Sequence, residues 1–282
     1  MHYLDFLAAL HERLAPPSYL EIGIRHGDSL ALARCPAVGI DPAFELHVEL
    51  RDDVALLRET SDEYFDRDDP LAAFGGEPVA FAFIDGMHLA EFVVRDFANV
   101  ERNAEWSSVV VFDDILPRSL EEAARDRRSR TWTGDVYKVL DVLARHRPDL
   151  TCLRVDTEPT GLGIALGLDP LSRELGERYD AIVADVVAPD PQHVPAEVLE
   201  RAGALDPQAV LDSRVWPLLR AARERGVTRR RGIHALRRAV KRELGVSVPR
   251  ARLVDLASAG RAGRAAGAES AAAPGPVPPR RD

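Results

Sequence analysis

Short apolar runs alternate with polar stretches along the first two thirds of the chain, and several of these runs end in a glycine or a carboxylate. They predict strands at residues 18–24, 37–40, 79–84 and 109–112. Leucines at helical spacing predict a helix over residues 4–14, which two adjacent prolines end. The intervals between the strands are long enough for helical crossovers, so the pattern predicts an α/β protein with a mostly parallel sheet.

The pattern changes after a helix that we predict near residues 135–145. Two apolar runs, at 151–156 and 161–168, are separated only by the short turn Glu158-Pro-Thr160. Such a short connection joins antiparallel strands. These runs therefore predict a terminal hairpin whose last strand is antiparallel to its neighbour.

Beyond residue 169, apolar runs that predict strands no longer recur at regular intervals. This change sets the expected domain boundaries. Helical patterns occur near residues 196–201 and 215–225, and the apolar run 181–187 fits either a helix or a strand. We therefore expect a first domain over residues 1–169 and a mainly helical, basic appendage over residues 170–256. Residues 257–282 are mostly Ala, Gly, Pro and Arg, a composition that predicts a disordered tail.

Composition narrows the class of protein. The net charge of −9 argues against general affinity for nucleic acid. Only Cys35 and Cys152 are present, without metal-type spacing, which argues against a disulfide framework and a thiolate zinc site. No apolar run approaches the roughly 18 residues of a membrane span, and the first ten residues lack a basic leader. We therefore expect a cytoplasmic protein.

Arginine is concentrated between residues 220 and 252, in contrast to the acidic region before it. The simplest interpretation is the solvated face of helices. The alternatives are a surface that binds an acidic partner, a membrane surface or nucleic acid. The sequence leaves open whether this segment folds over an active site or mediates a homodimer.

Three predicted strands deliver carboxylates to one edge of the sheet. Glu21 lies in the first strand, Asp85 follows the strand ending at residue 84, and Asp113 and Asp114 follow the strand ending at residue 112. The carboxyl ends of parallel strands form the ligand-binding edge of open α/β sheets. We therefore expect a nucleotide-type cofactor pocket with a cation beside it. The structural alternative for Asp113 and Asp114 is a helix N-cap pair.

A glycine-containing turn follows the first strand, in the form Glu21-x-Gly23-x-x-x-Gly27-x-Ser29. Glycine lets a backbone turn sharply and approach a ligand closely. Asp41 ends the next strand, where a carboxylate can accept both hydroxyls of a ribose. Together these features indicate an adenosine-containing cofactor, although the turn alone could be structural. The glycine spacing is not that of dinucleotide binders, and the chain has no Gly-Lys-Ser/Thr phosphate loop, which weakens NAD and ATP as candidates.

Four segments carry a resemblance to a known family: Leu20-Glu-Ile-Gly-Ile-Arg-His-Gly-Asp-Ser29, Gly39-Ile-Asp41, Phe83-Ile-Asp-Gly-Met-His88 and Val111-Phe-Asp-Asp114. In order and spacing they resemble the class I S-adenosylmethionine-dependent methyltransferases. The closer similarity is to the bacterial subgroup of macrocin O-methyltransferase-like and cephalosporin hydroxylase-like proteins. The resemblance covers roughly residues 19–168. It implies a Rossmann-like, mostly parallel seven-stranded sheet with a reversed last strand, in agreement with the hairpin predicted above.

The resemblance also implies roles for individual residues. It places Glu21, Gly23 and Gly27 around the methionine part of S-adenosylmethionine (SAM) and Asp41 on its ribose. The full set of expected cofactor-binding residues is Glu21, Gly23, Gly27, Ser29, Asp41 and Asp85. Asp85, Asp113 and Asp114 are the expected ligands of Mg²⁺, since crowded carboxylates repel unless a cation or protons intervene and oxygen ligands suit this ion.

The expected reaction is metal-assisted methyl transfer to a hydroxyl of a small molecule, with a sugar or glycosylated metabolite as the preferred acceptor. Asp85 or His88 would take the proton of that hydroxyl, which makes them the expected catalytic residues. The alternative for His88 is a position on the surface or a supporting role behind the residues that contact the ligand. Two alternatives stay open. One is a cephalosporin hydroxylase-like protein of the same fold, and the other is a non-catalytic scaffold that docks through its arginine-rich C-terminal region.

The chain departs from the family pattern where the acceptor would bind. Met87 stands where a small or acidic residue is common, and Ile115-Leu-Pro-Arg-Ser119 gives no acceptor-binding signature. Trp132-Thr-Gly-Asp-Val-Tyr-Lys138 is a candidate lining of the acceptor pocket, because an aromatic ring beside Asp and Lys can stack on a ligand and hydrogen-bond to it. The alternative for Trp132 and Tyr137 is ordinary packing.

Overall fold

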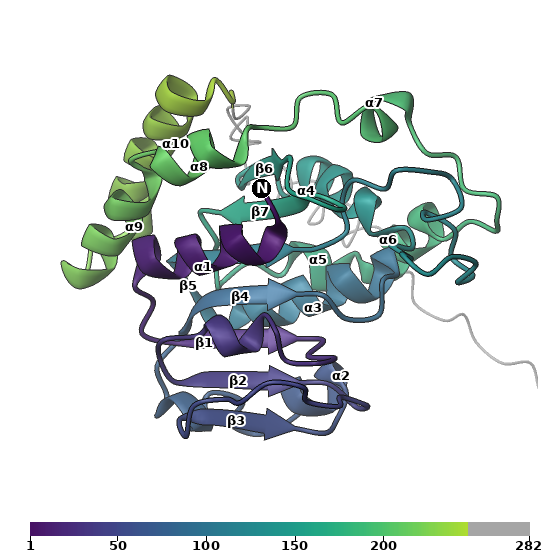
Figure 1. Ribbon diagram of the computed structural model, residues 1–282. Helices are drawn as coiled ribbons and strands as arrows, with labels where there is room; N and C mark the ends of the chain where they lie inside the picture. The colour runs from purple at the N-terminus through teal and green to yellow at the C-terminus, as the bar shows by residue number, and fades with distance from the viewer. Residues whose placement is uncertain (248–282) are drawn as a thin grey trace, which may run out of the picture. The chain divides into compact units, whose positions relative to one another are not determined.

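A seven-stranded sheet forms the centre of the computed structural model, which describes residues 1–247 (Figure 1). The predicted tail and residues 248–256 of the predicted appendage lie outside the described residues. The strands are β1 (Tyr19–Ile22), β2 (Ala37–Ile40), β3 (Val54–Leu57), β4 (Val79–Ile84), β5 (Ala104–Phe112), β6 (Thr151–Val155) and β7 (Leu162–Leu166).

The strand order is β3-β2-β1-β4-β5-β7-β6. The strands from β3 to β5 pair in parallel, whereas β7 is antiparallel to both β5 and β6. The prediction of a mostly parallel α/β sheet with a reversed last strand is confirmed. Because Phe112 at the end of β5 pairs with Gly163, the turn between β6 and β7 lies at the carboxyl edge of the parallel strands.

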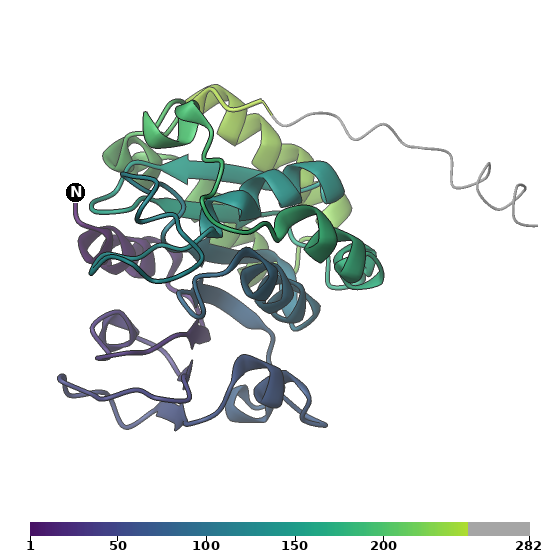
Figure 2. The same ribbon diagram turned by 90° about the vertical axis from the view of Figure 1, so that its right-hand side faces the viewer.

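Helices cover both faces of this sheet, and α1 and α3 lie on opposite sides of it (Figure 2). The helices are α1 (Tyr3–Leu14), α2 (Ser61–Phe65), α3 (Ala90–Arg102), α4 (Val139–His146), α5 (Glu174–Glu177), α6 (Tyr179–Val186), α7 (Ala196–Leu199), α8 (Pro207–Asp212), α9 (Val215–Glu224) and α10 (Arg229–Leu244). Within residues 1–247, no helix has both the length and the apolar character needed to cross a membrane.

Successive side chains of each strand point to opposite faces of the sheet, which divides the apolar core into two layers. Tyr19 of β1 and Phe81 of β4 point toward α1, α9 and α10, and they share one buried cluster with Trp216 and Leu236 of those helices. Leu20 and its neighbours in register face α3, α4 and α6 in the other cluster. The segment after residue 169 therefore supplies helices to both faces, with α9 and α10 completing one layer of the core.

Candidate active site

The chain order reverses between β1 and β4, which are adjacent in the sheet. In open α/β sheets, such a switch point at the carboxyl edge forms the ligand crevice. Backbone hydrogen bonds extend the ladder past the strand ends, from the Asp85 N–H to the Ile22 carbonyl (2.8 Å) and from the Asp113 N–H to the Ile84 carbonyl (3.1 Å). The glycine turn and the carboxylates after β4 and β5 therefore lie side by side at this crevice.

Gly23 makes the contact between the first two of these loops. Its φ is +89°, and a Cβ atom there would lie 2.0 Å from the Asp85 carbonyl oxygen. Only glycine permits both this conformation and this approach. Gly27, also at φ +89°, lies under Leu46 and Val48 of the segment that follows β2, so this segment covers the glycine turn.

Glu21 lies beneath the turn and is fully buried. It accepts hydrogen bonds from the Tyr19 hydroxyl and the Ser29 hydroxyl, each at 2.7 Å. Burial raises the pKa of Glu21 to about 8, although both hydrogen bonds act in the opposite direction. In this arrangement Glu21 and Ser29 brace the turn from inside the protein.

Asp41 also holds the glycine turn in place. Its Oδ2 accepts from the backbone N–H groups of Ile24 (3.0 Å) and Arg25 (2.9 Å), and its Oδ1 accepts from Ala43 (2.7 Å). A carboxylate has about four acceptor positions, so three donors leave capacity for a hydroxyl. The position after β2 thus remains compatible with a bound ribose.

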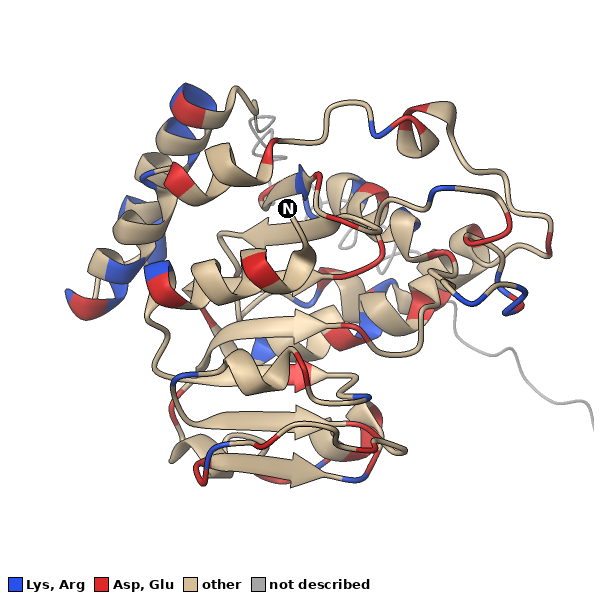
Figure 3. Ribbon diagram, in the orientation of Figure 1, with Lys and Arg blue, Asp and Glu red and all other residues tan. Residues whose placement is uncertain are grey.

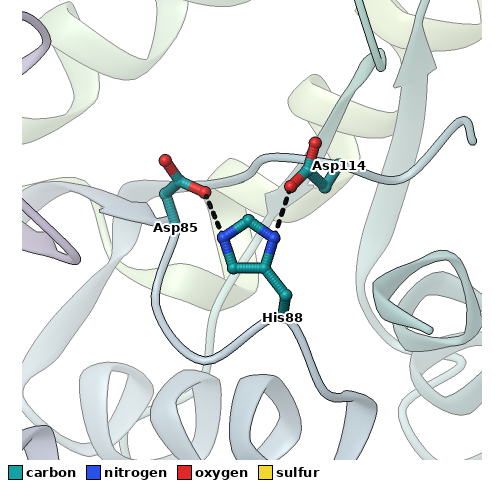
Figure 4. Close-up of side chains that lie close together, drawn as sticks. All are labelled: Asp85, His88 and Asp114. Carbon is teal, nitrogen blue, oxygen red and sulfur yellow. Dashed lines mark ion pairs between the residues drawn. The ribbon is translucent and has the colours of Figure 1, made fainter. Parts of the chain in front are cut away.

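Asp85, His88 and Asp114 converge at the edge (Figure 4). The His88 ring lies between the two carboxylates, with Nδ1 at 2.7 Å from Asp114 Oδ2 and Nε2 at 3.4 Å from Asp85 Oδ1. One possible ligand atom from each residue lies within 4.8 Å of the others. Nδ1 is also 3.0 Å from the Trp132 carbonyl oxygen, and the Trp132 ring stacks on the imidazole at 5.2 Å and 9°.

Electrostatics in this cluster favour a positively charged histidine. Burial lowers the pKa of His88, but the hydrogen bond to Asp114 and the charge of Asp85 raise it to about 9. Burial raises the pKa of Asp85 to about 7, against the opposing effect of His88. The imidazolium therefore neutralises part of the charge that two neighbouring carboxylates bring to the site.

Backbone strain is concentrated in the same place. Arg25, His88 and Asp114 have φ values of +50°, +54° and +62°, which side chains other than glycine rarely adopt. Residues held in such conformations cluster at functional sites, where the surrounding structure stabilises them. The sequence does not reveal this signal, because His and Asp adopt positive φ more often than most residues but still only occasionally.

Asp113 differs from its neighbour. Its Oδ1 accepts the backbone N–H of Asp114 at 2.8 Å, and it is not part of the convergent group of three, in which His88 provides the third ligand atom. Burial and then the charges of Asp114 and Asp85 raise the pKa of Asp113 well above its usual range.

The segment predicted as an acceptor lining contributes to the site through packing. The Trp132 indole N–H donates to the Ala124 carbonyl, and the Tyr137 hydroxyl donates to the His193 carbonyl (3.2 Å). Asp135, fully buried, accepts the Ala90 N–H at the start of α3 (2.8 Å) and pairs with Arg125 (2.8 Å) and Lys138 (2.9 Å). This network was not predicted, because its only local signal in the sequence is the spacing of Asp135 and Lys138.

Part of this chain is similar to known proteins. Residues 20–115 match a family model described as a methyltransferase domain. No curated protein matches the chain. Among solved structures, the O-methyltransferase TomG from Streptomyces achromogenes, in complex with SAM, is 19% identical, with a TM-score of 0.43 over 59% of this chain and 80% of that one. The O-methyltransferase from Bacillus cereus, in complex with S-adenosylhomocysteine (SAH), is 16% identical, with a TM-score of 0.42 over 58% of this chain and 80% of that one.

The family match begins in β1 and ends directly after Asp114, so it contains the glycine turn, Asp41 and the convergent cluster. The sheet order and the reversed β7 agree with the fold expected from the resemblance. Over residues 20–115, the chain therefore matches a methyltransferase domain.

Proposed function

We propose that this methyltransferase transfers the methyl group of SAM to a hydroxyl of a small molecule, with a sugar or glycosylated metabolite as the preferred acceptor and with help from a divalent cation. The observation that carries the proposal is the convergence of Asp85, His88 and Asp114 beside the glycine turn. It supplies groups for proton transfer at the switch point where the cofactor would bind.

The residues at the edge have separate roles in this proposal. When bound, SAM supplies an electrophilic methyl group, and a divalent cation stabilises the charge that develops on the acceptor oxygen. The backbone around Gly23 and Gly27 holds the methionine part of SAM, while Asp41 accepts from the ribose. Asp85 and His88 are the groups available to accept the proton of the acceptor hydroxyl.

A divalent cation fits the cluster in size and chemistry. Ligand atoms on opposite sides of an ion are about 4.2 Å apart for Mg²⁺ and about 5 Å apart for Ca²⁺. The ligand atoms of Asp85, His88 and Asp114 lie within 4.8 Å of one another, which suits Ca²⁺ directly and Mg²⁺ after a small inward movement of the side chains. We propose Asp85 and Asp114 as carboxylate ligands, with Asp113 and His88 as the remaining candidates. His88 lies between the carboxylates, so a bound ion would either take it as a ligand or displace its ring.

A metal-free mechanism is the second candidate. The stacking of His88 on Trp132 and its hydrogen bond to Asp114 already orient the ring without an ion. In this version His88 alone accepts the proton, and Asp114 stabilises the resulting imidazolium.

Calorimetric titration of SAM, first with Mg²⁺ and then with EDTA, tests the proposal. We expect wild-type protein to bind SAM in the micromolar range. Asp41→Ala should lose SAM binding, while Asp85→Ala should lose Mg²⁺ binding. Asp68→Ala changes an exposed aspartate away from the edge and should behave like wild type.

The outcomes separate the alternatives. Absence of SAM binding in both conditions would overturn the proposed function and favour the scaffold that docks through its arginine-rich region. SAM binding and turnover that are unaffected by EDTA would leave the metal-free mechanism. Failure to convert SAM to SAH with any hydroxylated acceptor would favour the cephalosporin hydroxylase-like alternative.

A further inference from the structure

We propose that a polar cleft at the same edge of the sheet as Asp114 is the acceptor subsite and that it binds a hydroxyl-rich molecule, an inference that rests on the proposed function. The cleft has a volume of about 830 Å³, within the range of small-molecule sites. Its polar lining consists of Arg118, Asp156, Glu158, Arg201 and Asp206.

Two connections place the cleft at the same edge as the convergent cluster. Arg118 lies four residues after Asp114 in the loop that follows β5. Glu158 lies in the turn between β6 and β7, which the strand register puts at the end of β5. The Leu116 N–H donates to the Thr160 carbonyl at 2.7 Å, so the loop and the turn are joined directly.

Arg201 holds the loop after β5 and the turn between β6 and β7 in position relative to each other. Its guanidinium pairs with Asp156 and donates to the backbone carbonyls of Pro159, Thr157 (3.2 Å) and Leu116 (3.5 Å). Arg201 is also the one position after residue 114, among residues 1–247, where a non-glycine residue has a positive φ, at +56°. A strained residue that clamps a cleft wall is typical of a binding site whose shape must be preserved.

Glu158 is the lining group left free for a ligand. Its backbone is occupied, since its N–H donates to the Met1 carbonyl (2.9 Å) and its carbonyl accepts from Tyr3 (2.9 Å). Its side chain is exposed toward the cleft, and no hydrogen bond is recorded for its carboxylate within residues 1–247. Among the described residues, the turn thus presents an unpaired carboxylate to the cleft from an anchored backbone.

The composition of the lining indicates the class of ligand. Carboxylates accept hydrogen bonds and guanidinium groups donate them. A hydroxyl can donate to the first and accept from the second. Within the part of the chain that the structure describes, no aromatic side chain lines the cleft. A planar phenol would find no stacking partner there, whereas a polyol would satisfy groups of both kinds.

Ligand-observed saturation-transfer NMR on the full chain, loaded with SAH, tests the proposal. The probes are methyl β-D-glucopyranoside and cellobiose, with catechol as the contrasting planar probe. We expect the glycosides to bind at millimolar concentration. Glu158→Gln and Arg201→Lys should weaken glycoside binding by roughly tenfold. The first removes a charged acceptor, and the second removes the guanidinium that joins the turn to the loop after β5. Glu200→Gln, at an exposed neighbour outside the lining, should leave it unchanged.

SAH affinity, measured on every variant, separates this proposal from the proposed function. Loss of SAH binding in wild type would overturn the function itself, and this inference with it. With SAH bound, three results would overturn the subsite alone: no glycoside binding, preferential binding of catechol, or glycoside binding that Glu158→Gln and Arg201→Lys do not change. Unaltered SAH affinity in those variants shows that they have kept their fold.

Discussion

Single residues at the carboxyl edge hold backbone conformations that constrain the whole site. Gly23 touches the Asp85 backbone, and His88 and Asp114 adopt positive φ values while their side chains meet. The position of each functional group therefore depends on the backbone of its neighbours as much as on its own side chain. Substitutions that alter only the backbone should consequently affect the site.

Gly23→Ala tests this dependence. The added Cβ would lie 2.0 Å from the Asp85 carbonyl oxygen, so we expect a loss of roughly 3 kcal/mol or more in unfolding free energy, together with loss of SAM binding. Gly75→Ala is the matched control, because Gly75 also has a positive φ (+66°) but its Cβ would meet nothing within 4 Å. It should cost only about 1–2 kcal/mol. Equal losses in urea unfolding would contradict the steric argument.

Asp96, on α3, should make stability depend on pH. Burial raises its pKa from 3.8 to about 7, although it accepts a hydrogen bond from the Ser61 hydroxyl at 2.6 Å. The folded state therefore binds a proton that the unfolded state releases. This contribution to stability is fully present below about pH 4 and is lost as the pH rises through about 7.

Asp96→Asn keeps the acceptor for Ser61 and removes this titration. Relative to wild type, its unfolding free energy should rise by about 2–4 kcal/mol between about pH 4 and pH 8. Asp180→Asn, at an exposed position on α6, should show no such change. Chemical denaturation across this pH range provides the measurement, and a constant difference between Asp96→Asn and wild type would disprove the assignment.

At the scale of elements, α10 approaches the sheet closely because one of its residues has no side chain. A Cβ on Gly232 would lie 1.9 Å from the Trp106 ring. The Trp106 indole N–H also donates to the Val227 carbonyl just before α10. Helix and strand are therefore joined at this point by shape and by a hydrogen bond.

Gly232→Ala should destabilise the protein by about 1–3 kcal/mol, although alanine normally stabilises a helix interior by about 1 kcal/mol relative to glycine. Gly176→Ala, in α5, is the comparison, since its Cβ would meet only the Arg102 guanidinium at 3.8 Å. That variant should be neutral or slightly more stable. Thermal and urea unfolding of the two variants would reveal any departure from these opposite signs.

The same elements explain how much of the fold the sequence could predict. The central strands carry continuous apolar runs, because both of their faces are buried, and they were predictable. β3 was missed, since it is a short edge strand whose residues are only half-buried. The arginine-rich stretch is interpreted as the solvated face of helices, but the bounds of α10 are not predicted, since its large buried side chains are only Ile233, Leu236 and Val240.

The candidate site was predictable in part. Strand ends placed Asp85 and Asp114 at one edge, because the topology brings such positions together. The insertion of His88 between them depends on its positive φ and on stacking with Trp132, which come from residues 44 positions apart. Whether Asp113 binds a metal remains a prediction.

At the scale of the whole molecule, charge is divided between two parts of the chain. Residues 207–247 contain eleven Lys and Arg against three Asp and Glu, whereas residues 1–206 contain twenty against forty. The basic side chains gather on α9 and α10 (Figure 3). Yet α9 and α10 bury Trp216, Leu219 and Leu236 in the same cluster as β4 and β5. Whether residues 1–169 form a domain separate from the appendage can be tested by removing the appendage.

A chain that ends at Asp169 should not fold, because the face of the sheet under α9 and α10 would be exposed. Each large buried side chain contributes about 1.5–3 kcal/mol, so several together exceed the stability of a typical domain. Circular dichroism and analytical ultracentrifugation should show an unfolded or aggregated product. A monomeric, cooperatively unfolding fragment would instead establish the first domain as independent.

Leu236→Ala tests the same point in the intact chain. Leu236, on the sheet-facing side of α10, is fully buried, so we expect a loss of about 2–5 kcal/mol in unfolding free energy. Leu171→Ala, at a leucine that is 81% exposed, should change it by less than about 0.5 kcal/mol. Similar small effects in both variants would indicate that α10 contributes little to the core.

The gathering of carboxylates at one edge has a consequence for turnover. SAM carries a positively charged sulfonium, whereas SAH is a neutral thioether at the same atom. In the proposed complex, the potential from Asp41, Asp85 and Asp114, which the His88 imidazolium offsets only in part, favours the cation, so methyl transfer removes the charge that this edge attracts. SAH should therefore dissociate from the protein more readily than SAM. This difference in dissociation should become smaller as added salt screens the electric field of the carboxylates.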